Sequence, residues 1–190
     1  MRYNFAFEGC GPVLAGAGNG KVAFASLIRH TTQEPQRPAP LFLDFKDVEV
    51  ATASFLRESV FALKLYLRAV RSNFYPVATN PNETVYDELI MVANALGDAI
   101  VSCILGSDDD VSDVGLIGQL EPKQQQTFEL VNELKIADAS CLMRLYGAAE
   151  QTKATTAWNN RLASLAAKGL ILEFSRGRAK YYQPLLEEGA

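Results

Sequence analysis

Short apolar runs alternate with longer segments of helical length in the first hundred residues, and this alternation constrains the fold most. The runs Leu41–Phe45, Tyr75–Thr79 and Ala99–Leu105 have the length of buried strands. Between them, residues 54–72 are largely apolar and contain no Gly or Pro, and residues 82–97 begin with a capping asparagine and end at a glycine. Strands that alternate with helices predict an α/β layer.

The first thirty residues predict an antiparallel hairpin in this layer. Residues 3–7 place apolar side chains at every second position, and residues 21–28 follow a glycine-rich turn that ends in Asn19-Gly20. Residues 33–40 contain three prolines and predict a loop, because proline fixes φ and donates no backbone hydrogen bond. We therefore expect an α/β N-terminal domain with a mixed sheet over residues 1–118.

Residues 106–119 predict an acidic linker between two domains. A cluster of carboxylates suits a divalent cation, but a calcium loop also needs a glycine at its sixth position and a glutamate at its twelfth, and neither falls correctly here. A solvated loop without metal is therefore expected. The aspartates in question are Asp108, Asp109, Asp110 and Asp113.

Charge is divided unevenly along the chain. The whole chain has a net charge of −4, but residues 1–150 hold 12 Lys and Arg against 19 Asp and Glu, whereas residues 151–190 hold 6 against 3. An acidic body with a basic end indicates that the two parts have different tasks, although a merely solvated basic face would have the same composition.

The C-terminal part predicts three helices followed by a two-stranded hairpin, a small α+β domain over residues 119–190. In the third helix Trp158, Leu162 and Leu165 recur at spacings of four and three, which defines one buried face. The predicted elements are helices at 123–135, 138–147 and 157–168, strands at 170–174 and 180–184, and a basic hairpin tip at 175–179.

This order of elements resembles the winged helix-turn-helix of bacterial transcription regulators. In that family a leucine pair precedes a Gly-Leu-Ile or Gly-Leu-Val turn into the wing, and here Leu162 and Leu165 precede Gly169-Leu170-Ile171. The resemblance covers residues 123–185. It implies that the third helix enters the major groove of double-stranded DNA while the wing approaches the backbone. Some winged helices bind protein instead, so a protein partner stays open.

The predicted DNA contacts lie on the third helix and the wing. An asparagine amide both donates to and accepts from adenine, hydroxyl groups bond phosphates, and Lys and Arg neutralise phosphate charge. Arg161, beside the apolar face, has internal pairing as its alternative. The predicted contacts are Lys153, Thr155, Thr156, Asn159, Asn160, Arg161, Ser164, Arg176, Arg178 and Lys180.

Residues 41–56 resemble the strand, turn and helix of STAS-like domains, the type found in anti-sigma-factor antagonists. These domains place an apolar strand that ends in Asp, here Asp44, before a turn and a Ser-capped helix. The resemblance covers residues 40–105 and implies a domain that receives a signal or a protein partner. It also makes Ser54 a candidate phosphoacceptor for a partner kinase, since a phosphate at a helix N-terminus changes a docking surface. A structural helix cap is the competing interpretation of Ser54.

No arrangement of residues predicts an enzyme, a cofactor or a metal site. His30 is the only histidine, and the odd number of cysteines (Cys10, Cys103, Cys141) predicts reduced thiols. The glycine-rich segment 16–21 invites a phosphate-loop interpretation, and with it a nucleotide-handling enzyme. However, Val22 stands where Ser or Thr must hold magnesium, and a mobile hairpin loop explains the segment more simply.

The sequence also predicts location and assembly. No segment has the pattern of a signal peptide, and none approaches the roughly 18 uninterrupted apolar residues of a membrane span. We expect a cytoplasmic regulator, without membrane contact, that binds DNA as a homodimer, because two-fold symmetry matches palindromic half-sites. The expected dimer faces are the helices at 55–70 and 128–134.

Overall fold

The computed structural model describes residues 1–106, 110–150 and 154–187, which form two compact units. The first unit comprises Met1–Gln119, with which Leu186 and Glu187 group, and the second comprises Leu120–Leu185. Within the described residues, no helix is both long and apolar enough to cross a membrane.

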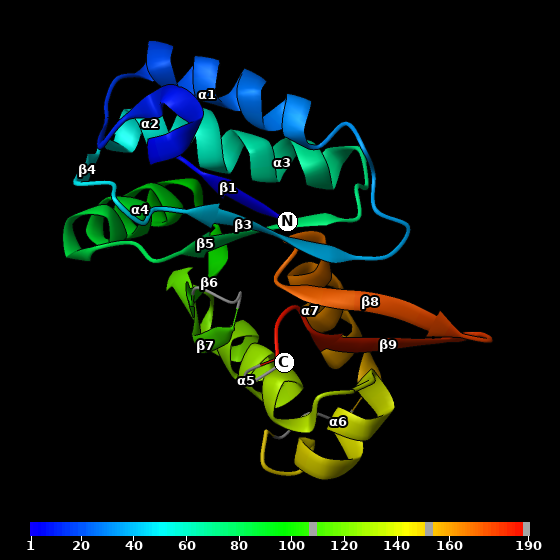
Figure 1. The fold of residues 1–190 in the computed structure, drawn as a ribbon. Helices are drawn as coiled ribbons and strands as arrows, with labels where there is room; N and C mark the ends of the chain where they lie inside the picture. Colours follow the sequence, from blue (N-terminus) through cyan, green and yellow to red (C-terminus); the bar gives the residue numbers. More distant parts are fainter. Residues whose placement is uncertain (107–109, 151–153, 188–190) are drawn as a thin grey trace. The chain divides into compact units, whose positions relative to one another are not determined.

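The first unit is an α/β layer around a five-stranded mixed sheet in the order β1-β3-β5-β6-β7 (Figure 1). The first four strands are parallel, and β7 pairs antiparallel with β6. The predicted α/β class and mixed sheet are confirmed. The strands are β1 Arg2–Asn4, β3 Ala39–Asp44, β5 Phe74–Thr79, β6 Ala99–Leu105 and β7 Val111–Gly118.

Helices connect the parallel strands of this sheet. Helix α1 (Ala17–His30) lies between β1 and β3, and α4 (Glu83–Leu96) lies between β5 and β6. Between β3 and β5 the chain is helical from α2 (Ala53–Leu56) through the π-helical segment η2 (Arg57–Phe61) to α3 (Ala62–Ala69). The Asn82 side chain caps α4 by accepting from the Val85 N–H at 2.9 Å, and Gly97 ends it at φ +60°.

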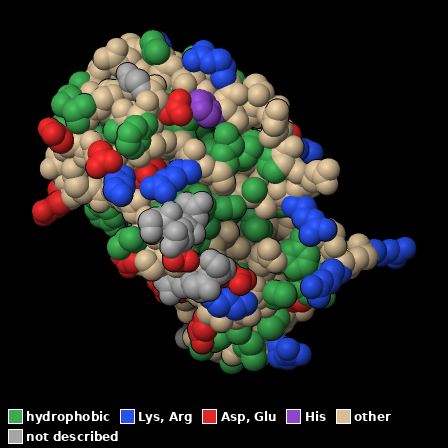
Figure 2. Space-filling view, in the orientation of Figure 1, with side chains coloured by type: hydrophobic (Ala, Val, Ile, Leu, Met, Phe, Trp, Pro, Cys, Tyr) green, Lys and Arg blue, Asp and Glu red, His purple; other side chains and the backbone are tan. Residues whose placement is uncertain are grey.

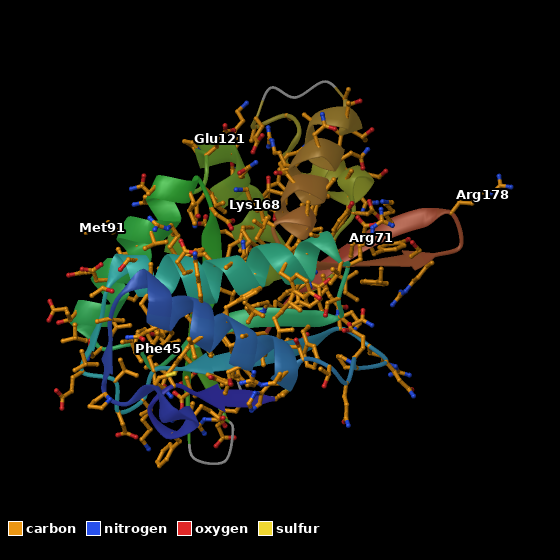
Figure 3. The ribbon with its side chains drawn as sticks, turned by 90° about the horizontal axis from the view of Figure 1, so that it is seen from above. Phe45, Arg71, Met91, Glu121, Lys168 and Arg178 are labelled. Atoms are coloured by element: carbon orange, nitrogen blue, oxygen red, sulfur yellow. The ribbon has the colours of Figure 1, made fainter. Side chains whose placement is uncertain are left out.

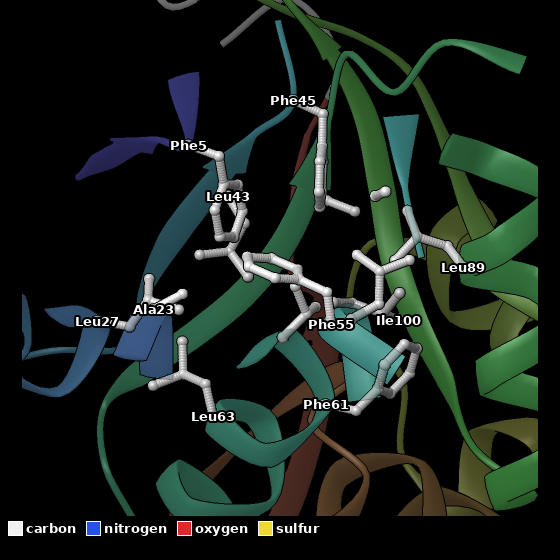
Figure 4. Packing of buried hydrophobic residues seen from close by; sticks show 14 of the residues in the cluster. Phe5, Ala23, Leu27, Leu43, Phe45, Phe55, Phe61, Leu63, Leu89 and Ile100 are labelled. Carbon is white, nitrogen blue, oxygen red and sulfur yellow. The ribbon is translucent and has the colours of Figure 1, made fainter. Parts of the chain in front are cut away.

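The core of the first unit lies between these helices and one face of the sheet (Figure 4). Leu41 and Leu43 of β3 point into it and are fully buried. The Phe5 ring stacks on Phe45 at a centroid distance of 4.9 Å and meets the Phe55 ring edge-on at 6.0 Å. Because side chains alternate along a strand, Asp44 at the end of β3 is directed to the opposite face.

The predicted N-terminal hairpin is wrong. Residues 21–28 belong to α1, and β1 pairs in parallel with β3. The apolar residues that suggested a strand include Ala23 and Leu27, whose spacing of four buries them on one face of α1. The glycine-rich segment is not a hairpin loop either, because Gly16 turns the chain at φ +84° directly before α1. The antiparallel pair that makes the sheet mixed is β6 with β7.

Most of the predicted acidic linker is an edge strand. Residues 111–118 form β7, where Ile117 is fully buried opposite Ile100 of β6. The sequence of β7 does not indicate a strand, because polar and glycine residues separate its few apolar residues. Of the aspartates, Asp113 lies within β7 at φ +51°, whereas Asp108 and Asp109 lie outside the described residues.

The second unit contains the three predicted helices and the predicted hairpin. These are α5 (Pro122–Leu134), α6 (Ala139–Tyr146), α7 (Thr155–Ala167), β8 (Ile171–Arg176) and β9 (Ala179–Pro184). Asp138 caps α6 by accepting from the Cys141 N–H at 2.7 Å. Between α5 and α6, Ala137 exchanges two backbone hydrogen bonds with Tyr182 of β9, at 2.9 and 2.8 Å. The connection between α5 and α6 therefore adds a one-residue bridge to the hairpin.

Candidate functional site

Helix α7 has one fully buried face and one exposed face. Trp158, Leu162 and Leu165 have no exposed surface, so the opposite side of the helix carries Thr156, Asn159 and Asn160, all exposed. The helix Thr155–Ala167 contains no acidic residue. Its exposed face thus offers amide and hydroxyl groups, and no negative charge within the helix repels an anion.

At the beginning of α7, no side chain of a described residue caps the backbone N–H groups. The residue that precedes the helix, Ala154, has no side chain that could accept from them. Thr155, the first residue of α7, is half-buried. The N–H groups and the helix dipole favour an anion at this end. Lys153, predicted to contribute here, lies outside the described residues.

Arg161 is held inside the second unit, and its prediction as a DNA contact is corrected. Its Nη1 lies 2.6 Å from Glu150 Oε2, and the two side chains are only 10% and 7% exposed. The guanidinium also lies over the Trp158 ring, 4.7 Å from the centroid. Arg161 comes three residues after Trp158 and therefore lies on the buried side of the helix. The internal pairing, the alternative that the sequence left open for Arg161, is the one observed.

Ser164 is likewise turned toward the interior of its unit. Its Oγ accepts a hydrogen bond from Gln124 Nε2 of α5 at 3.0 Å, and the residue is half-buried. The hydroxyl therefore joins two helices and is not presented to a ligand. On α7 the predicted contacts with exposed side chains are Thr156, Asn159 and Asn160.

The hairpin β8–β9 forms a basic wing. Arg176, Arg178 and Lys180 are all exposed, and Figure 3 shows Arg178 at the free end of the hairpin, where Gly177 turns the chain at φ +64°. Blue side chains gather along the same hairpin in Figure 2. The Arg178 side chain thus reaches furthest from the body of its unit.

The base of the wing is ordered by aromatic rings and an acidic residue. Phe174 and Tyr181 stack at 5.8 Å, and the Arg176 guanidinium lies 5.3 and 5.6 Å from their centroids. Glu173 receives Lys180 Nζ at 2.7 Å and the Tyr182 hydroxyl at 3.1 Å. Burial, and then the Glu173 charge, raise the pKa of Tyr182 to about 12. Lys180 is therefore paired with an acidic residue, whereas neither Arg176 nor Arg178 forms an ion pair with another described residue.

In the first unit, Thr52 caps α2, and the interpretation of Ser54 as a cap is wrong. Thr52 has extended backbone angles, and its Oγ1 accepts from the Phe55 N–H at 3.4 Å. Ser54 is the second residue of the helix, half-buried, with its Oγ 3.2 Å from Thr52 Oγ1. A cap needs a non-helical backbone at its own position, which Ser54 does not have.

Asp44 is the centre of a buried polar cluster that the sequence pattern identified only as the end of a strand. The side chain has no exposed surface and joins the carboxyl ends of β1, β3 and β5. Its oxygens accept from Arg2 Nε and Nη2 at 2.9 and 2.7 Å, Asn4 Nδ2 at 3.1 Å, Asn80 Nδ2 at 2.9 Å and the Lys46 N–H at 3.1 Å.

These bonds leave Asp44 fully occupied. Burial by itself raises the pKa of Asp44, but the Arg2 guanidinium, the Lys46 N–H and the Asn80 amide outweigh it and hold the pKa below its ordinary value. A carboxylate with so many donors stabilises the ends of three strands and has no lone pair to spare for chemistry.

No protein-family model and no curated protein matches the chain.

Proposed function

We propose that the chain is a non-enzymatic regulator whose second unit binds double-stranded DNA as a winged helix-turn-helix and whose STAS-like first unit receives a signal or a protein partner. The observation that carries this proposal is the exposed face of α7, which combines Asn159 and Asn160 with a positively polarised helix end that no side chain of a described residue caps. The order of elements in the second unit supports the proposal, because winged helix-turn-helix modules have the same order. The elements are α5, the Ala137 bridge, α6, α7, β8 and β9.

In this proposal α7 and the wing have different tasks. Asn159 and Asn160 read base edges in the major groove, where an asparagine amide matches the donor and acceptor of adenine. Arg176 and Arg178 bind phosphates, which contributes affinity without sequence preference. Thr156 bonds a phosphate near the beginning of α7.

A protein-docking function is the second candidate, and the ion pairs of this unit favour it. Arg161 and Lys180 are both paired with glutamates, so fewer cations are available for phosphates than the sequence suggested. In that case the wing would dock on an acidic protein, and the chain would act by switching partners.

In the first unit, Ser54 is the phosphoacceptor that a partner kinase would modify. Its hydroxyl stands in the first turn of a helical run that continues from Ala53 to Ala69. A phosphate there would face the partial positive charge of the helix N-terminus.

The glycines of the segment 16–21 are explained without a nucleotide, which weakens the nucleotide-handling alternative. Gly16 turns the chain at φ +84°, and Gly20 packs closely against the Phe55 backbone.

A titration with random duplex DNA separates the two main candidates. Full-length protein is titrated into a labelled duplex at 50 and 200 mM salt, and binding is followed by fluorescence anisotropy. We expect binding that weakens steeply with salt, and the double variant Arg176→Gln/Arg178→Gln should flatten the dependence of log K on log salt by about one unit for each lost contact.

The matched control is the double variant Arg37→Gln/Arg71→Gln. It removes the same charge from two exposed arginines of the first unit, which do not belong to α7 or the wing. Its salt dependence should equal that of the parent. Absence of binding at 50 mM salt, or equal losses in both double variants, would contradict the DNA proposal and favour docking on protein.

A further inference from the structure

The exposed face of α7 can read DNA only if the helix is held at one rotation about its axis. Successive residues on a helix are about 100° apart, so a modest rotation turns the Asn159 and Asn160 amides away from the base edges of the proposed interface. A binding site holds its groups to within about 10–20°. The buried side chains of Trp158, Leu162 and Leu165 constrain this rotation weakly, because apolar burial has no preferred direction. Directional contacts are therefore needed as well.

Arg161, which directly follows the two asparagines, makes such a directional contact. Its Nη1 lies 2.6 Å from Glu150 Oε2, and the two side chains are 10% and 7% exposed. The guanidinium plane is also fixed from one side, because it lies 4.7 Å from the centroid of the Trp158 ring. The ion pair and the ring together hold the Arg161 side chain in one orientation.

The Arg161 contact connects α7 to the end of α6. The Glu150 N–H donates to the carbonyl oxygen of Tyr146, the last residue of α6, at 3.1 Å. A second contact connects α7 to α5, where Gln124 Nε2 donates to Ser164 Oγ at 3.0 Å. Arg161 and Ser164 are three residues apart and are therefore neighbours on the helix surface. Polar contacts thus attach α7 to both of the helices that precede it.

The chemistry of the Arg161–Glu150 pair suits orientation better than stability. Replacement of a buried ion pair by apolar residues of similar volume often leaves stability unchanged or increases it, because the pair loses its hydration on burial. A guanidinium, however, is planar and donates along fixed directions, so its bonds resist a rotation of the helix that carries it.

We propose that Arg161 is a positioning residue that acts through Glu150 and Trp158. It fixes the rotation of α7 so that the Asn159 and Asn160 amides point outward, and it does not itself contact DNA. The consequence for sequence preference rests on the proposed DNA function, whereas the effect on α7 can be measured without DNA.

The double variant Glu150→Leu/Arg161→Met of the full chain tests the proposal. Both charges are removed together, because a single change would leave the other charge buried without its partner. Without DNA, hydrogen exchange followed by mass spectrometry should show the amides of α7 exchanging at least tenfold faster, with those of α5 unchanged.

With DNA, fluorescence anisotropy compares a preferred duplex, selected from a random pool, with random duplex. The ratio of the two affinities should fall at least tenfold in the double variant. Binding to random duplex and its salt dependence should equal those of the parent, because the net charge, Arg176 and Arg178 are unchanged. A merely structural role of the pair would lower both affinities together.

The control Arg57→Gln/Glu58→Gln removes an ion pair of the first unit, 3.1 Å long, and should alter neither measurement. Arg161→Lys is the second variant in case the double variant does not fold. It keeps a cation beside Glu150 but lacks the planar group, so it should fold and lose at least threefold in preference.

The proposal is overturned if the folded variants keep the hydrogen exchange of α7 or the sequence preference of the parent, or if both affinities fall equally. If the parent itself binds no duplex or shows no preference, the proposed DNA function fails. Hydrogen exchange of α7 then decides by itself whether Arg161 positions the helix.

Discussion

At the scale of single residues, Asp44 and Arg161 show how a buried charge is stabilised in each unit. Asp44 is surrounded by donors from β1, β5 and the turn after β3, and Arg161 is paired with Glu150 across the segment that joins α6 to α7. The guanidinium and the carboxylate of each pair come from different parts of the chain, 42 residues apart for Arg2 and Asp44 and 11 for Arg161 and Glu150. A buried ion pair is costly to break because removal of one partner leaves the other charge desolvated.

We predict that Asp44→Asn destabilises the first unit by about 3 kcal/mol, because the amide cannot balance the Arg2 guanidinium that donates to this side chain twice. Urea unfolding followed by circular dichroism measures the loss. The matched control is Asp87→Asn, an exposed carboxylate on α4, for which a change below about 0.5 kcal/mol is expected.

The same carboxylate makes stability depend on pH. The pKa of Asp44 is lower in the folded than in the unfolded state, so its contribution is present above the unfolded value of about 3.9 and is lost as the pH falls through the folded value. The difference in stability between parent and Asp44→Asn should therefore shrink below about pH 4. A difference that stays constant down to pH 2 would contradict this role.

At the scale of elements, the packing of α1 depends on the close approach of one of its glycines, Gly20, to α2. A Cβ on Gly20 would lie 2.7 Å from the Phe55 carbonyl oxygen, which is backbone and cannot move aside cheaply. A Cβ on Gly18, in the same helix, would meet nothing within 4 Å. Close packing therefore requires a glycine at position 20, whereas position 18, two residues away, has room for a side chain.

We predict opposite signs for alanine at these two positions. Gly20→Ala should destabilise the first unit by about 1–3 kcal/mol through overpacking against α2. Gly18→Ala should stabilise it by about 0.5–1 kcal/mol, because alanine has less conformational entropy to lose in a helix. Thermal and urea unfolding of both variants check this, and equal effects at the two positions would exclude the close approach as the cause.

Helix α7 is the element on which sequence preference should depend. We predict that Asn159→Ala or Asn160→Ala costs about 1–3 kcal/mol on a preferred duplex selected from a random pool and relaxes the preference at one base pair. Binding to random duplex should stay nearly unchanged. The matched control is Gln125→Ala on α5, whose amide donates to Glu129 at 2.8 Å and belongs to another helix. An unchanged base preference in both asparagine variants would contradict the assignment of α7 as the reading helix.

At the scale of the whole molecule, we expect a homodimer that uses the helical run from Ala53 to Ala69. Leu65 is 73% exposed, and it lines a shallow depression together with Leu96 of α4. The other expected face is not available, because Phe128 and Val131 of α5 are buried. Apolar side chains exposed on neighbouring helices are typical of an interface.

Light scattering at tens of micromolar protein should give twice the mass of the chain, and Leu65→Glu should reduce it to that of a monomer. Met91→Glu, at another exposed apolar position of α4, is the control for the charge and should remain dimeric. A monomeric parent, with or without duplex DNA, would show that the apolar helix face has another use.

The sequence by itself determined the elements whose signals are local. Strand β6 and helix α4 were predicted with nearly their observed bounds, because a short apolar run, a capping asparagine and a terminal glycine all lie within the element that they define. The three helices and basic hairpin of the second unit followed from the same kind of signal.

Only the tertiary structure decided which segments pair and which charges remain accessible. The apolar pattern of residues 21–28 fits both a strand and one face of a helix, and the parallel pairing of β1 depends on β3, about forty residues away. Arg161 and Ser164 are residue types that often contact DNA, but in the fold they bond to Glu150 and Gln124 instead. These partners lie 11 and 40 residues away in sequence. Periodicity describes one element at a time, whereas burial and ion pairing depend on neighbours that the fold brings together.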